Sequence, residues 1–161
     1  MAEQEFDPIK VPIRPAATVM LIRDHPRNGV EVFMLQRTLN AAFAKGMYVF
    51  PGGRVDANDA ESTLEAHCDG MTDEEASALL GIPHGGLSYW VAVIRECFEE
   101  AGVLLARPAD GQDLIRFEDE DVIARFNKAR HSVHEGETSM MQLCDAEQLR
   151  LITDNIHYVS H

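Results

Sequence analysis

The sequence contains few cysteines and no long apolar run. Its three cysteines, Cys68, Cys97 and Cys144, form no C-x-x-C pair, so we expect no disulfide framework and a reducing compartment. No apolar stretch approaches the roughly 18–20 residues that a membrane helix needs. The first seven residues are acidic and polar, unlike a signal peptide. We therefore expect a cytoplasmic protein with no membrane partner.

Basic residues are also scarce. The chain carries 14 Lys and Arg against 27 Asp and Glu, a formal net charge of −13. Such a surface repels phosphate polymers, which argues against a nucleic-acid partner. A small phosphorylated substrate is still compatible with this negative charge, because a metal ion can neutralise both the phosphate and the acidic residues. With 45% hydrophobic and 25% charged residues over 161 positions, the composition predicts one globular domain, 1–161.

The N-terminal third has a β pattern. Three prolines make residues 1–15 an expected extended arm. Residues 17–23 and 30–37 are β-rich and predict two strands of a hairpin, joined by a turn that contains Asn-Gly. Residues 46–50 predict a third strand, which we expect to stop at Pro51-Gly52-Gly53 because proline cannot donate to a ladder.

Helix signals follow. Thr72 and Glu75 have the spacing of a capping box and predict a short helix that runs to Leu80 and stops at Gly81. A stronger helix covers 90–101, whose apolar residues recur at steps of three and four.

The last third predicts mainly helices. Residues 119–130, with Val122, Ile123, Phe126 and Ala129 inward, and residues 138–150 have helical patterns. Residues 103–105 predict the start of a strand, and the chain reaches 159–161 inside another strand-like stretch. We therefore expect 106–161 to be mainly helical.

The helix over 90–101 carries three carboxylates on one flank. At 100° per residue, Glu96, Glu99 and Glu100 fall between about 180° and 280° from Trp90. Like charges this close repel, whereas a hard divalent cation such as Mg²⁺ seeks oxygen ligands. Arg95 lies four residues before Glu99 and can pair with it. The alternative is a solvated acidic face.

These residues resemble a known family. Residues 95–103, Arg-Glu-Cys-Phe-Glu-Glu-Ala-Gly-Val, resemble the second half of the Nudix box, R-E-U-x-E-E-x-G-U, in which U is apolar. Residues 50–53, Phe-Pro-Gly-Gly, resemble the strand end and glycine pair that open it.

The spacing inside the box departs from the usual G-x5-E-x7-R. Counted from Gly53, the Glu position holds Asp59, and 35 residues (60–94) replace the usual seven. We expect the inserted residues, mainly 60–87, to loop out.

An interrupted box resembles the coenzyme A diphosphatase subgroup of Nudix proteins. Residues 35–37 and the spacing from Gly46 to Gly53 also resemble that subgroup's signature, although Ala42 stands where the signature has an arginine.

The resemblance implies a chemistry. Nudix enzymes use Mg²⁺ or Mn²⁺ and water to cleave a nucleoside diphosphate linked to another moiety. It implies that Glu96, Glu99, Glu100 and the carbonyl of Gly53 ligate metal, that Arg95 orients Glu99, and that Glu96 is a candidate general base.

Basic residues outside the helix are candidates for substrate contacts. Arg37, Lys45 and Arg54 are candidates for the phosphates, with a solvated surface charge as the alternative reading of each. His131 and His134 have a spacing that could suit zinc but lack the H-E-x-x-H pattern, so we interpret them as surface residues.

The resemblance also implies a fold: an α/β/α sandwich (α+β) around a mixed sheet, incomplete at its C-terminal end. An open sheet edge predicts a homodimer through edge pairing or strand exchange. The leading substrate is coenzyme A or an acyl-coenzyme A. The alternatives are ADP-ribose, nucleotide sugars or dinucleoside polyphosphates, or a binding or assembly module without turnover.

Overall fold

The computed structural model describes residues 12–39 and 45–160. Most of the expected N-terminal arm, residues 1–11, lies outside the described residues, as do Ala42 and His161. Residues 12–15 have no regular secondary structure.

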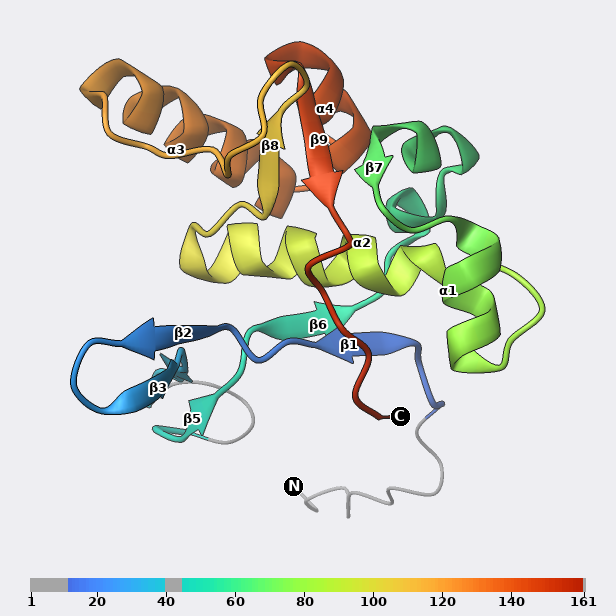
Figure 1. Ribbon diagram of the computed structural model, residues 1–161, viewed down its shortest axis with the longest axis horizontal. Helices are drawn as coiled ribbons and strands as arrows, with labels where there is room; N and C mark the ends of the chain where they lie inside the picture. The colour runs from blue at the N-terminus through green and yellow to red at the C-terminus, as the bar shows by residue number, and fades with distance from the viewer. Residues whose placement is uncertain (1–11, 40–44, 161) are drawn as a thin grey trace, which may run out of the picture.

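Short strands open the fold (Figure 1): β1 (Ala16–Thr18), β2 (Ile22–His25), β3 (Gly29–Val32), β4 (Leu35–Gln36) and β5 (Tyr48–Val49). The expected hairpin is confirmed, with β2 antiparallel to β3. The expectation of continuous strands over 17–23 and 30–37 is wrong. Both break because the chain changes partner: β1 pairs with β6, whereas β4 pairs with β5.

The glycine pair is itself part of a strand, contrary to the expected stop at residues 51–53. β6 (Gly52–Arg54) pairs antiparallel with β1. Pro51 still contributes its carbonyl, which accepts a hydrogen bond of 3.0 Å from the amide of Val19. A Cβ at Gly52 would lie 2.5 Å from the carbonyl oxygen of Ala17. The strand forms there because glycine allows this close approach.

The helix of the motif is the centre of the molecule. The predicted helix is present as α2 (Leu87–Glu96), which continues into a π-helical turn, η4 (Cys97–Ala101), and ends at a left-handed Gly102. In Figure 1, α2 lies between the β1–β6 pair and a second layer that contains β7, β8 and β9. Packing from both sides explains why Val91 and Ala92 are as buried as the predicted apolar stripe.

The inserted segment does not loop out. It follows η2 (Ala57–Ala60) and forms η3 (Ser62–His67), β7 (Cys68–Asp69) and α1 (Asp73–Leu80), the last with the predicted capping box and Gly81 stop. Leu64 and Ala76 are buried in the core, and β7 pairs parallel with β9. The loop prediction was wrong because these apolar residues pack on α2 and on a strand far away in the sequence.

The remaining elements are β8 (Ala106–Pro108), α3 (Glu120–His134), α4 (Met140–Glu147) and β9 (Leu149–Ile152). The longest elements of 106–160 are the helices α3 and α4, and α4 contacts β9, the middle strand of a mixed sheet of order β7–β9–β8.

Four local expectations fail in this region. The strand expected at 103–105 begins at Ala106. Residues 149–152 are strand, because they pair with β7 and β8. Residues 159–160 have no regular structure. Ile123 is exposed, because α3 turns Phe126 and Val133 inward instead.

The core lies around α2 and the second layer: Leu64, Ala76, Trp90, Val91, Ile94, Phe98, Leu104, Phe126, Met140, Leu143 and Leu151 are among its buried members. The strand layer from β2 to β5 is different, since many of its apolar side chains are exposed, namely Met20, Ile22, Val30, Val32, Phe33, Met34, Leu39, Met47 and Tyr48. Within residues 12–39 and 45–160, no helix is long and apolar enough to cross a membrane.

Candidate active site

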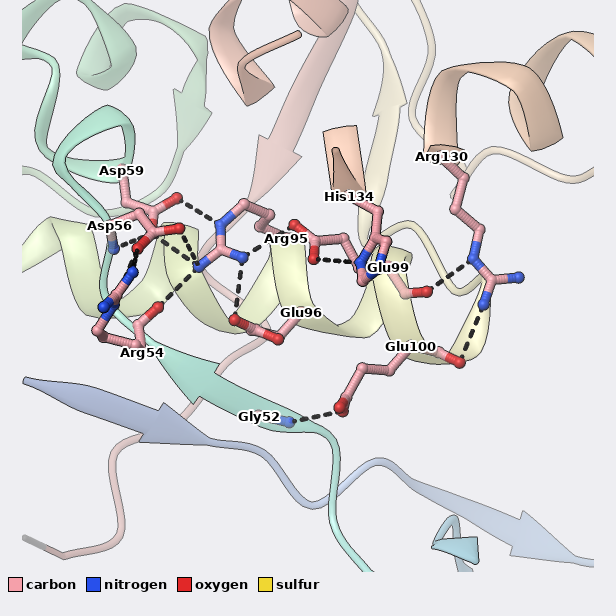
Figure 2. Close-up of polar contacts among 10 residues, drawn as sticks. All are labelled: Gly52, Arg54, Asp56, Asp59, Arg95, Glu96, Glu99, Glu100, Arg130 and His134. Atoms are coloured by element: carbon pink, nitrogen blue, oxygen red, sulfur yellow. Dashed lines mark hydrogen bonds and ion pairs between the residues drawn. The ribbon is translucent and has the colours of Figure 1, made fainter. Parts of the chain in front are cut away.

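Arg95 lies at the centre of the hydrogen bonds in the site (Figure 2). Its Nε and Nη2 donate to the two carboxylate oxygens of Asp59 at 2.9 and 3.0 Å, and Nη2 also donates to the carbonyl of Arg54 at 2.8 Å. The Asp59 side chain is 1% exposed and the Arg95 side chain 9%. One guanidinium therefore fastens the chain that follows β6 onto α2, in the fork geometry that arginine provides.

The same guanidinium orients two of the predicted carboxylates. Nη1 of Arg95 lies 2.9 Å from Oε1 of Glu96 and 2.9 Å from Oε1 of Glu99. The predicted pairing of Arg95 with Glu99 is confirmed. The side chains of Glu96 and Glu99 are only 14% and 11% exposed, which is inconsistent with a solvated acidic face; Glu100 is exposed.

Burial and charge act together on this group. Burial raises the pKa of Glu96 above its ordinary value, with Arg95 opposing the shift and the negative charges of Glu99 and Glu100 adding to it. Burial alone would lower the pKa of Arg95, but its hydrogen bonds to Asp59 and Glu99 and the surrounding carboxylates raise it. Arg95 is therefore a permanent positive charge, and added positive charge near Glu96 and Glu100 would relieve repulsion.

The double-glycine strand meets two of the three carboxylates. The amide of Gly52 donates to Oε2 of Glu100 at 3.2 Å. A Cβ added to Gly53 would overlap the carboxylate of Glu96. A residue with a side chain cannot occupy position 53 without moving Glu96, which gives the second glycine a physical reason at this site.

Glu99 points elsewhere. Its second oxygen, Oε2, lies 3.3 Å from Nδ1 of His134, and Figure 2 shows it between Arg95 and His134, away from Gly52. Across residues 12–39 and 45–160, no three His, Cys, Asp or Glu side chains are close enough to hold one metal ion. The structure thus brings Glu96 and Glu100 to the glycine strand and leaves Glu99 apart.

The donor set nevertheless has the chemistry of a hard-cation site. Glu96 and Glu100 offer carboxylate oxygens beside β6, and Gly53 offers a backbone carbonyl on the same strand. Oxygen donors of this kind suit Mg²⁺ or Mn²⁺. For Glu99 to join them, it would have to exchange its contacts with Arg95 and His134.

The three residues predicted to contact phosphates lie in two different places. Arg54 lies at the edge of the site, where its side chain pairs with Asp56 at 3.0 Å. Arg37 and Lys45 are exposed near the β4–β5 pair. No hydrogen bond or ion pair ties either side chain to the carboxylates in the part of the chain that the structure describes.

Sequence reasoning missed Arg130, and it interpreted His134 as a surface residue without linking it to the site. Arg130 donates to the carbonyl oxygens of Glu99 and Glu100 at 2.8 and 3.0 Å, and His134 contacts the Glu99 side chain. Their i, i+4 spacing on one helix is the signal that could have paired them, but nothing local links α3 to η4.

Known proteins give the context. The fold resembles that of a NUDIX hydrolase from Alicyclobacillus acidocaldarius with a TM-score of 0.64 and 23% identity, covering 89% of this chain and 59% of that one. This likeness confirms the Nudix fold that the motif predicted. No family model matches the chain.

The sequence has curated relatives as well. It is 27% identical over 139 residues to the acyl-coenzyme A diphosphatase NUDT19 of Xenopus laevis, covering 71% of this chain and 36% of the relative. It is 30% identical over 118 residues to the Homo sapiens protein of that name, covering 59% and 32%. The chain is thus similar in sequence to two acyl-coenzyme A diphosphatases and in fold to a Nudix hydrolase. It spans about a third of the length of these curated relatives, and it resembles the coenzyme A diphosphatases among Nudix proteins.

Proposed function

We propose that this chain carries the diphosphate-cleaving site of a Nudix hydrolase and that its substrate is coenzyme A or an acyl-coenzyme A. The observation that carries the proposal is the meeting of β6 with the motif helix, where Gly52 bonds Glu100 and Gly53 packs on Glu96. The likeness to NUDT19 acyl-coenzyme A diphosphatases supports the substrate class.

In this proposal, Glu96, Glu100 and the Gly53 carbonyl hold the metal, and Glu99 completes the set. When bound, Mg²⁺ or Mn²⁺ would neutralise diphosphate charge and lower the pKa of an attacking water. Arg95 keeps Glu96 and Glu99 oriented.

Proton transfer is assigned to Glu96. Its carboxylate lies against Gly53 of β6, beside the position proposed for the metal, so it is the candidate general base. Arg37, Lys45 and Arg54 are proposed phosphate contacts, of which Arg54 lies beside Asp56 at the site.

The test is hydrolysis of coenzyme A in the presence of Mg²⁺ or Mn²⁺. The proposal expects 3′,5′-ADP and a phosphopantetheine as products, lost in a Glu99→Gln, Glu100→Gln double variant. A matched control, Glu118→Gln with Glu120→Gln, removes two exposed charges from another part of the chain and should keep the activity. Turnover of ADP-ribose, nucleotide sugars or dinucleoside polyphosphates instead would replace the substrate assignment.

A second candidate is a binding or assembly module without turnover. The turned-away Glu99 favours it, because the carboxylates are not gathered around one point. Calorimetric binding of coenzyme A with no product formed, at any metal concentration, would establish this second function.

We also propose that a second copy of the chain covers the exposed apolar layer. In the described residues β2 and β3 pair only with each other, so each leaves an open edge, and Ile22 and Val30 expose apolar side chains there. Sedimentation velocity would detect a homodimer, and a monomer at all concentrations would contradict it.

A further inference from the structure

The motif helix ends in backbone carbonyls that its own turns do not satisfy. The amide of Gly102 bonds back to Phe98, and that of Val103 bonds back to Cys97. The carbonyls of Glu99 and Glu100 point instead at Arg130, whose Nε and Nη2 donate to them at 2.8 and 3.0 Å. A cation at the C-terminal end of a helix is favourable both for hydrogen bonding and for the helix dipole.

Gly102 fits this contact. Its φ of +68° favours glycine. In addition, a Cβ at this position would lie 3.2 Å from Nη1 of Arg130. The final glycine of the motif therefore both turns the chain and leaves room for the guanidinium over the helix end.

Arg130 is held in place by the core. On α3, Phe126, Arg130 and Val133 follow one another at steps of four and three, so they share one face of the helix. Phe126 and Val133 are buried, at 2% and 4% exposure. The face that packs α3 into the core thus also delivers Arg130 to the end of α2.

His134 extends the same face by one turn and contacts the Glu99 carboxylate at 3.3 Å. The space beside it is a cavity of about 90 Å³ lined partly by Arg95, Glu99 and His134. Ligand pockets are typically several hundred Å³, so this cavity is too small for a nucleotide. The contacts of Arg130 and His134 are with protein groups, namely the backbone carbonyls of Glu99 and Glu100 and the Glu99 carboxylate.

We propose that Arg130 and His134 form a clamp, by which α3 fixes the last turn of the motif helix and hence the two carboxylates carried there, Glu99 and Glu100. Arg130 acts through the backbone and His134 through the Glu99 side chain. Both are positioning residues for the site. Their contacts with the helix end do not depend on the proposed function, whereas their effects on metal binding and turnover rest on it.

The test compares Arg130→Met, Arg130→Lys and Lys128→Met with the parent chain. Arg130→Met removes both donors at similar length, and Lys128→Met removes an exposed charge from the same helix as the matched control. The first measurement is hydrogen exchange of the Gly102 and Val103 amides in metal-free protein. The second is Mn²⁺ affinity by electron paramagnetic resonance, with kcat and KM for coenzyme A.

For Arg130→Met we expect exchange at these amides to rise about tenfold and Mn²⁺ affinity to fall about tenfold, the effect of losing hydrogen bonds to a charged donor. The kcat should fall while KM stays unchanged. Arg130→Lys should recover part of each loss and decides the matter if the methionine variant does not fold. Lys128→Met should match the parent.

If amide hydrogen exchange at Gly102 and Val103 is the same in Arg130→Met as in the parent, the clamp is overturned. If the parent binds Mn²⁺, an unchanged Mn²⁺ affinity in Arg130→Met also overturns it. A parent chain that binds no Mn²⁺ and cleaves no coenzyme A would refute the proposed function instead. The exchange measurement then decides the clamp alone, with faster exchange supporting it.

A separate variant tests the role of His134. His134→Gln should leave amide exchange at Gly102 unchanged, because no hydrogen bond joins His134 to that backbone, and should raise Mn²⁺ affinity, because Glu99 must give up its contact with His134 to join Glu96 and Glu100. A raised exchange rate in His134→Gln would contradict the division of roles between the two residues.

Discussion

Asp59 and Arg95, separated by 36 positions in the sequence, are joined by two hydrogen bonds of 2.9 and 3.0 Å between one carboxylate and one guanidinium. The pair closes the interrupted motif: it brings the residues after β6 against α2 although a folded segment intervenes. The side chain of Asp59 is shorter than the Glu of the usual box, but it reaches Arg95 because η2 brings it there. The amide of Asp56 donates to Oδ2 of Asp59 at 2.8 Å.

Removing this carboxylate should destabilise the fold. We expect Asp59→Asn to lower the free energy of unfolding by about 2 kcal/mol, because it leaves a buried Arg95 with less compensating charge. Urea denaturation measures the loss. Asp110→Asn, at an exposed turn, is the control, and an equal effect of both changes would contradict the structural role of Asp59.

A methyl group at position 53 should disturb the site more than the fold. Gly53→Ala would push the Glu96 carboxylate away from β6, so we expect Mn²⁺ affinity and turnover to fall at least tenfold. Gly81→Ala is the control, since it introduces strain at a φ of +66° but meets no atom within 4 Å. It should reduce stability and leave Mn²⁺ affinity unchanged. Equal Mn²⁺ affinity in Gly53→Ala and the parent would rule out the proposed role of Glu96.

The inserted segment should make stability depend on pH through Asp69. Burial acts to raise the pKa of Asp69, but hydrogen bonds from Arg150 and Arg107 outweigh it and hold the pKa below its ordinary value of 3.8. A lowered pKa contributes stability that is complete above 3.8 and disappears as the pH falls through the folded-state value. Asp69→Asn should thus be less stable than the parent at pH 7 and approach it in acid. A difference that persists unchanged under strongly acidic conditions would count against this ion pair.

The cysteines should be unreactive in the folded chain. Burial raises the pKa of each of Cys68, Cys97 and Cys144 to about 12, so thiolate is scarce at pH 8. We expect slow alkylation of all three thiols in native protein and fast alkylation in urea, as read by mass spectrometry. Rapid native labelling of Cys97 would show that η4, the last turn of the motif helix, is not packed in the core.

Local signals in the sequence predicted local structure. Thr72, Glu75 and Gly81 define α1 because a capping box and a left-handed stop depend on neighbours a few residues away. The apolar periodicity of α2 and the i, i+4 pair of Arg95 and Glu99 are equally local, and both are present.

What failed depended on distant partners. Glycines have little preference for strands, yet Gly52 and Gly53 pair because β1 lies beside them. The helical pattern expected over 138–150 runs into β9 (Leu149–Ile152), because only pairing with β7 and β8 makes these residues a strand. Arg130 could not be assigned to the site, because its contact crosses 31 positions to the carbonyl of Glu99.

The most direct test is a crystal structure of this chain grown with Mn²⁺, with anomalous scattering recorded at the manganese edge. The account expects an anomalous peak within bonding distance of the carboxylates of Glu96 and Glu100 and of the Gly53 carbonyl. An anomalous peak at another place in the chain would contradict the account. The absence of any peak at Mn²⁺ concentrations that support turnover would contradict it as well.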